Sequence, residues 1–270
     1  TQIYEITSSA IRNDTHEEVQ VAAIEFWITV AATEESMLEE EERLRVEGRN
    51  GPAECKKYVE SATGNFVPLL LETLSKHGDD TDEDTYDLRA AGSCCLESFA
   101  LTVGSQIVHV VLPFVQLHIT SEEWRLRDAA LVAFFSILDG PSTTVLGQYV
   151  QQIVPVLLRA FSDSNVIVQD SAVHCISNIC KLHMQAVQPD HVHAIIQGLI
   201  MKLQESPKLA DSACSAIFFM SASMKDPEGM PESNLLSRPM LALMQALIAT
   251  MDRPDAKERD WRVGAMSAAG

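Results

Sequence analysis

The residues with the greatest potential for chemistry lie in one acidic stretch, residues 78–87. Six of these ten residues are carboxylates: Asp79, Asp80, Asp82, Glu83, Asp84 and Asp87. An EF-hand calcium loop requires Gly at its sixth position and Glu at its twelfth, and this stretch has neither. Closely spaced like charges repel one another, so we expect an extended loop that attracts a basic partner. An inert, solvated acidic loop is the alternative that this composition also allows.

Histidine and cysteine, the other candidates for metal binding or catalysis, lack the required spacing. His191 and His193 are two residues apart, hence on different faces of a helix, and no zinc-type cysteine pair lies near them or near His183. Most of the six cysteines fall in apolar runs, which indicates small buried residues in a reducing compartment. No glycine-rich phosphate loop or nucleophile elbow is present. The sequence predicts no metal, no cofactor and no enzymatic activity, although a helical hydrolase with a site assembled from distant residues is an alternative.

The overall charge constrains the partners. The chain has 20 Lys+Arg against 38 Asp+Glu, a formal net charge of -18. Because a nucleic-acid surface requires clustered positive charge, we expect no nucleic-acid partner and favour basic protein partners. Hydrophobic residues make up 46% of the chain, so it should fold around a core. No stretch approaches the roughly 18 consecutive apolar residues of a membrane span, so we expect no membrane association.

An internal repeat organises the chain. Its motif is an apolar residue, then Arg, Gln or Ala, a variable residue and two small residues. The first residues of its copies are Val19, Leu88, Leu126, Val168, Leu209 and Trp261. Most intervals are close to the ~40–47 residues of helical-hairpin repeats. Small side chains let neighbouring helices approach closely, and a hairpin that cannot bury both apolar faces alone must stack on others.

A second motif, in phase with the first, places Pro68, Pro113 and Pro155 inside apolar helical patterns. A proline inside a helix costs about 3 kcal/mol or more, so its recurrence indicates a shared structural position. We therefore predict an all-α fold, an armadillo-like α-α superhelix of HEAT repeats, as a single array over residues 1–270. The expected hairpins span 1–32, 61–104, 105–140, 148–184, 190–225 and a truncated 233–270. Insertions occupy 33–60, which indicates a solvated helix end and linker, and 78–87.

Several strings, in order along nearly the whole chain, resemble the karyopherin-β family of nuclear transport receptors. They are Ile24-Glu25-Phe26-Trp27, Leu88-Arg89-Ala90-Ala91-Gly92, His109–Phe114, Glu123–Ala130, Ile137–Pro141 and Asp252–Asp255. The Trp-Arg-x-Arg-Asp-Ala-Ala and Asp-Gly-Pro strings carry most of the weight. Because the chain begins at Thr1 without Met, we expect a central fragment of such a receptor. The resemblance implies a protein of the cytoplasm, nucleus and nuclear pore that carries proteins through the pore.

The resemblance also implies partners. The second helices of the hairpins would line an inner face that binds a basic segment of the adaptor importin alpha, or basic cargo signals, and the GTPase Ran in its GTP form. The contacts of the acidic loop would be Asp79, Asp80, Asp82, Glu83, Asp84, Tyr86 and Asp87. The first helices would bind Phe-Gly nucleoporins, with Ile3, Tyr4 and Thr7 as the candidates.

Three positions depart from the family pattern, which places tryptophans along the inner groove. Tyr86, His174 and Ser215 stand there instead, and only Tyr86 retains some capacity for cation–π contact. His174 and Ser215 remain candidates for the inner groove. Trp27 and Trp124 are retained, and we expect them in the core or at repeat junctions. A scaffold subunit of another complex, such as a protein phosphatase, is the alternative, but the acidic insertion within a repeat favours the receptor.

Overall fold

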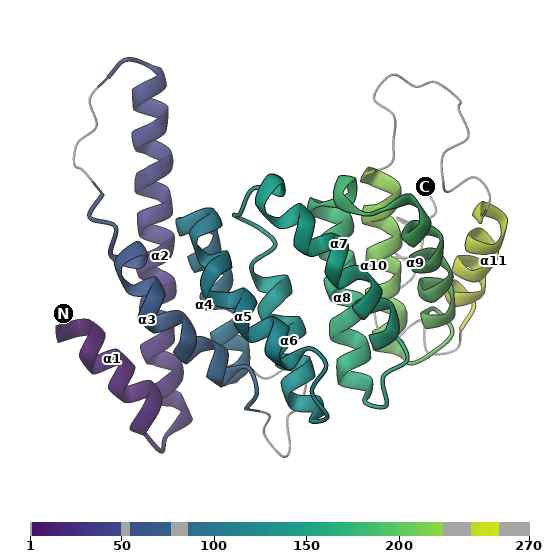
Figure 1. Cartoon of the computed structure of the whole chain (residues 1–270), viewed down its shortest axis with the longest axis horizontal. Helices are drawn as coiled ribbons and strands as arrows, with labels where there is room; N and C mark the ends of the chain where they lie inside the picture. Colours follow the sequence, from purple (N-terminus) through teal and green to yellow (C-terminus); the bar gives the residue numbers. More distant parts are fainter. Residues whose placement is uncertain (1, 50–54, 77–85, 224–238, 254–270) are drawn as a thin grey trace. The chain divides into compact units, whose positions relative to one another are not determined.

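The computed structural model describes residues 2–49, 55–76, 86–223 and 239–253, and every regular element in these residues is a helix (Figure 1). The predicted all-α class is confirmed by these helices. The chain divides into two compact units, Thr1–Ser142 and Thr143–Gly270. Each unit has its own stacked hairpins and its own core.

The first unit stacks three helical hairpins in two layers. Its helices are α1 (Gln2–Asn13), α2 (Glu17–Val46), α3 (Tyr58–Thr73), α4 (Leu88–Val103), the short 3-10 helix η1 (Gly104–Ile107), α5 (Val108–His118) and α6 (Trp124–Ser136). The odd-numbered helices pack side by side in one layer, and the even-numbered helices form the other (Figure 1). Each odd-numbered helix also packs on the even-numbered helix that follows it.

The second unit repeats this plan. Its helices are α7 (Thr143–Ala160), α8 (Val166–Leu182), the 3-10 helix η2 (Met184–Ala186), α9 (Pro189–Lys202), α10 (Pro207–Ser223) and α11 (Met240–Met251). Helix α8 packs against α10 in the even layer, and α9 lies between α7 and α11 in the odd layer. The repeat motif lies in the first turn of α2, α4, α6, α8 and α10, and its sixth copy at Trp261 lies outside the described residues.

The small residues of the motif permit close helix packing. A side chain at Gly92, on α4, would overlap the hydroxyl of Thr73 on α3. Gly140, in the Asp-Gly-Pro string, has a φ of +103°, and a Cβ there would overlap the backbone carbonyl of Ala100. Because only glycine tolerates that backbone region easily, the string fixes the connection after α6 against the end of α4.

Helix α2 supplies the helix end expected at the start of the insertion at 33–60. It continues through Val46, so the first half of this insertion is helical. Its last turns carry ion pairs at helical spacing, from Arg43 to Glu40 and Glu47 and from Arg45 to Glu42. Pairs three or four residues apart stabilise a helix by a few tenths of a kcal/mol each, which explains how so many like charges remain helical.

One helical run, Leu88–His118, is long and apolar enough to cross a membrane by length and composition alone. Charged residues such as Arg89 and Glu97 interrupt this run, so it contains no continuous apolar stretch of that length. It comprises α4, η1 and α5, divided at Gly104 with a φ of +59°. Helix α4 packs on α2, α3 and α6, and α5 packs on α3 and α6. The apolar composition is thus accounted for by the core of the first unit.

Candidate partner-binding surfaces

The acidic stretch ends at the N-terminus of α4. The side chain of Asp87 caps this helix, since it accepts a hydrogen bond from the N–H of Ala90 at 2.8 Å. Glu17 of α2 accepts a second bond from the N–H of Leu88 at 2.9 Å. Carboxylates at this position satisfy free amides and interact favourably with the helix dipole. Asp87 therefore positions α4, whatever else it contacts. The remaining loop candidates, Asp79, Asp80, Asp82, Glu83 and Asp84, lie outside the described residues.

Tyr86 presents an aromatic ring where the acidic stretch meets α4. Its side chain is 47% exposed. Partial burial of the phenol raises the pKa of Tyr86, and negative charge at Cys94, Glu25 and Cys95 acts in the same direction. Glu25 is exposed on α2, the neighbouring helix of the even layer. The even layer of the first unit therefore carries an exposed ring at the start of α4 and an exposed carboxylate on the adjacent α2, a combination that suits a Lys or Arg side chain.

Polar bonds at the repeat spacing hold the even helices of each unit in register. The Nη2 atom of Arg89, on α4, lies 2.6 Å from Oδ2 of Asp128, on α6. The side chain of Asp128 is fully buried. Ser93 and Ser136 form a second link between the same helices at 2.9 Å. In the second unit, Ser212 of α10 donates to Asp170 of α8 at 2.9 Å. Arg89, Asp128, Asp170 and Ser212 all belong to copies of the repeat motif, so the motif encodes both the close packing and the register.

The Phe-Gly candidates on α1 have different environments. Ile3 is 57% exposed, as the prediction requires, whereas Tyr4 is half-buried with its ring edge-on to Phe66 at 6.3 Å. Thr7 is only 8% exposed. The hydroxyl of Thr7 accepts a hydrogen bond from the indole Nε1 of Trp27 at 2.9 Å, so Thr7 joins α1 to α2 and is not a surface contact.

Ile6, which was not among the predicted contacts, is 69% exposed on α1. Its position three residues after Ile3 places both side chains on one helix face, and that spacing could have identified it. Trp27 is buried, as expected, and packs against Phe66 of α3 and Phe99 of α4 with ring centroids 5.0 and 6.1 Å away. This aromatic cluster fixes the helix whose outer face carries Ile3 and Ile6.

His174 on α8 and Ser215 on α10 both reach the surface of the second unit. Two bonds, between Ser212 and Asp170 and between Ser223 and the carbonyl of Cys180, place the two helices at an offset of 42 to 43 residues. That register puts Ser215 beside the turn of α8 that holds His174. Desolvation lowers the pKa of His174; Asp170 opposes this shift and Lys208 adds to it. The imidazole is therefore neutral at pH 7.

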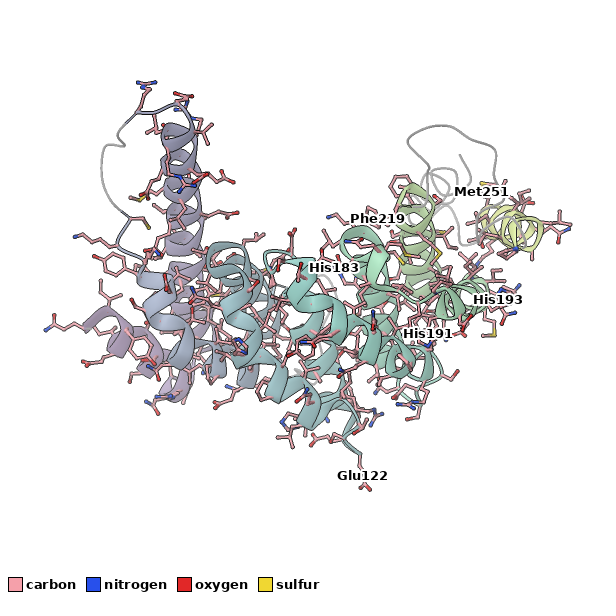
Figure 2. All side chains as sticks on the ribbon, turned by 45° about the horizontal axis from the view of Figure 1, so that its top comes forward. Glu122, His183, His191, His193, Phe219 and Met251 are labelled. Atoms are coloured by element: carbon pink, nitrogen blue, oxygen red, sulfur yellow. The ribbon has the colours of Figure 1, made fainter. Side chains whose placement is uncertain are left out.

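The three clustered histidines form no metal site. His183 is buried with its Nδ1 atom 3.2 Å from the hydroxyl of Thr143, and His193 is exposed with Nε2 2.9 Å from the amide nitrogen of Gln197 (Figure 2). Within the described ranges, no group of three His, Cys, Asp or Glu residues is placed to hold a metal ion. All six thiols are free, and only that of Cys94 is exposed.

Comparisons with known proteins agree with this architecture. The model of a family described as "Stalled ribosome sensor GCN1-like, HEAT repeats" matches residues 59–213. The chain is 33% identical to importin subunit beta-1 of Arabidopsis thaliana, over 98% of this chain and 31% of that relative. It matches the Kap95 chain of a Kap95:Nup1 complex with a TM-score of 0.89 and 28% identity, over 98% of this chain and 30% of that one.

A second solved structure describes Kap95p binding that induces the switch loops of RanGDP to adopt the GTP-bound conformation. This chain matches it with a TM-score of 0.88 and 26% identity, over 98% of this chain and 30% of that one. The chain thus spans less than a third of the length of these relatives.

Hairpins stacked in two layers, a motif at the start of each even-numbered helix and the family match define a HEAT-repeat protein, as the sequence predicted. The agreement with importin subunit beta-1 and Kap95 extends over nearly the whole chain in both sequence and structure. Within the HEAT-repeat proteins, this chain belongs to the karyopherin-β family, and the predicted resemblance is confirmed.

Proposed function

We propose that this chain works within a nuclear transport receptor that carries proteins through the nuclear pore and moves between cytoplasm and nucleus. It acts by binding other proteins and has no catalytic activity of its own. Its membership of the karyopherin-β family supports this role, as do the solved complexes of a structural relative with RanGDP and with Nup1. The partners follow from two separate surfaces of the first unit.

The first surface is the even-layer face around Tyr86. We assign to it the basic segment of importin alpha or of cargo, and Ran in its GTP form. The observation that carries this proposal is the exposed ring of Tyr86 at the start of α4, near the end of a stretch with six carboxylates and next to α2, on which Glu25 is exposed. A basic side chain would stack on the ring and meet carboxylates nearby, and the acidic surroundings would speed its encounter.

Tyr86→Ala tests this surface. A cation–π contact at an exposed site contributes about 0.5–1 kcal/mol, so we expect the Kd for Ran-GTP or for the basic importin alpha segment to rise about two- to fivefold. Tyr58→Ala is the matched control, because Tyr58 is equally exposed but lies on α3, in the other layer. Tyr86→Trp should tighten binding. Equal effects of the two alanine variants in a fluorescence titration would refute the role of Tyr86.

The acidic stretch calls for a separate variant. Asp79, Asp80, Asp82 and Asp84 are changed to Asn and Glu83 to Gln, while Asp87 is kept because it caps α4. We expect weaker binding of the basic partner and a flatter dependence of Kd on salt between low and moderate ionic strength, since exposed charges act through screened Coulomb attraction. An unchanged Kd at both salt concentrations would show that the stretch is inert.

The second surface is the outer face of α1, which we assign to Phe-Gly nucleoporins. Ile3 and Ile6 offer adjacent exposed apolar side chains, and Tyr4 borders them. The double variant Ile3→Ser, Ile6→Ser should abolish binding of a Phe-Gly peptide, measured by NMR titration. Val46→Ser is the control, since Val46 is an exposed apolar residue at the far end of α2. Unaltered peptide binding by the double variant would remove this surface from the proposal.

His174 and Ser215 receive no part in binding the basic partner. The imidazole of His174 and the hydroxyl of Ser215 carry no negative charge, and neither offers the large ring face of a tryptophan. The face of the second unit on which they stand has other properties.

A further inference from the structure

The face formed by α8 and α10 carries an uncommitted positive charge. Its carboxylate Asp170 is already engaged, because it accepts a hydrogen bond from Ser212 and lies 3.4 Å from Nζ of Lys208. Lys181, by contrast, is exposed and has no carboxylate at ion-pair distance among the residues that the structure describes. Its Nζ instead lies 5.7 Å from the ring centroid of Phe219.

The ring beside this cation, that of Phe219, contacts a second and more exposed aromatic ring. Phe218 on α10 is 38% exposed, and its ring meets that of Phe219 edge-on at 5.3 Å. Figure 2 shows Phe219 near the C-terminal end of α10. Ser215 and Ala222, one turn before and one turn after Phe218, are small and exposed. They leave the flanks of the Phe218 ring open to an incoming side chain.

The two helices that present these residues are fixed to each other. Ser223 of α10 donates a hydrogen bond to the carbonyl of Cys180, the neighbour of Lys181, at 2.6 Å. The bond between Ser212 and Asp170 joins the other end of the pair. A surface whose backbone is already ordered loses little conformational entropy when a ligand binds.

We propose that Lys181, Phe218 and Phe219 form a docking surface for a protein segment that carries a Leu or Phe anchor next to an acidic side chain. The apolar anchor packs on Phe218, and the carboxylate pairs with Nζ of Lys181. A basic segment is disfavoured here, because it would approach a lysine with no neutralising partner among the described residues. The occupant therefore differs in charge from the one proposed for the face around Tyr86, and the two proposals stand independently.

The test uses three short probes and the whole chain with labelled alanine methyl groups. The probes are Ac-Glu-Leu-Phe-Glu-amide, its neutral form with Gln and its basic form with Lys. We expect the acidic probe to shift the Ala222 methyl resonance in a saturable way and to leave Ala32, exposed on α2, unchanged. The neutral probe should bind more weakly, and the basic probe should not saturate Ala222.

Charge reversal then separates specific from general electrostatics. Lys181→Glu should raise the Kd of the acidic probe about tenfold or more and let the basic probe shift Ala222, as expected when one close charge pair is reversed. Lys56→Glu makes the same change of charge on the first unit and should have no effect. Phe218→Ser should abolish the shifts from every probe, and Lys181→Gln gives a milder variant should the reversal disturb folding.

Three results would overturn the proposal. One is equal binding of the acidic and neutral probes. Another is an identical effect of Lys56→Glu and Lys181→Glu. The third is saturable binding of the acidic probe to the Phe218→Ser variant. None of these results bears on Ran-GTP titrations, which report on the first unit.

Discussion

Glu34 anchors the start of α3, and its removal should destabilise the first unit. Its buried carboxylate accepts hydrogen bonds from the N–H groups of Tyr58 at 2.6 Å and Val59 at 3.0 Å. These amides belong to the first turn of α3 and have no acceptor within the helix. Without Glu34, the buried amide of Val59 loses its acceptor, at about 1–3 kcal/mol. Loss of the cap on Tyr58 adds about 1 kcal/mol. We therefore expect Glu34→Ala to lower the free energy of unfolding by about 2–4 kcal/mol.

Urea unfolding and hydrogen exchange of the α3 amides measure this effect. Glu39→Ala is the matched control, since Glu39 is exposed on the same helix. Glu34→Gln should fall between the two, because its amide oxygen can still accept one of the two bonds. Exchange should accelerate most at Val59 and in the next turn of α3. A difference below about 0.5 kcal/mol between Glu34→Ala and the control would refute the reasoning, because surface substitutions already vary by that amount.

Three further predictions concern both units. Gly140→Ala should destabilise the first unit by about 2 kcal/mol or more in urea unfolding, since it combines a positive φ with overlap on the Ala100 carbonyl. In a thiol titration with a disulfide reagent, the native protein should react at the exposed Cys94 alone and the unfolded protein at all six thiols, as burial raises the pKa of Cys180 to about 12. The second unit should lose stability as pH falls through about 6.5. Desolvation lowers the folded pKa of His174, so the unfolded chain binds more protons than the folded chain in this range. In unfolding experiments at a series of pH values, His174→Gln should flatten this dependence.

The sequence predicts the helices well where the determinants are local. The motif that begins at Val168 lies two residues into α8, and Pro155 lies inside α7, as the repeat pattern requires. Helical periodicity and small residues act within a few turns, so they can be read along the chain. A helix end was expected at the start of 33–60, but the charge pattern did not indicate that α2 continues as far as Val46. The stabilising partner of Glu34 is 24 to 25 residues away, and no local pattern indicates that bond.

The candidate surfaces were only partly predictable for the same reason. The exposure of Ile3 agrees with its predicted role, but Thr7, four residues later, is buried by its bond to Trp27 in the next helix. The aromatic pair Phe218 and Phe219 lies in an apolar run that looks like core. Only the packing of α10 on α8 shows that Phe218 reaches the surface. Exposure depends on contacts between repeats, which a single sequence does not display.

Not every carboxylate of this chain serves to attract a partner, because several hold the fold together. Glu17, Glu34 and Asp87 are bound to helix N-termini, and Asp128 and Asp170 are bound to cations or hydroxyls of neighbouring helices. Neutralising these residues would weaken partner binding by loosening the repeats and would leave the salt dependence of Kd steep. Neutralising the carboxylates of residues 79–84 should flatten the salt dependence at unchanged stability. Measuring both quantities for each variant therefore distinguishes carboxylates that hold the fold from those that attract the partner.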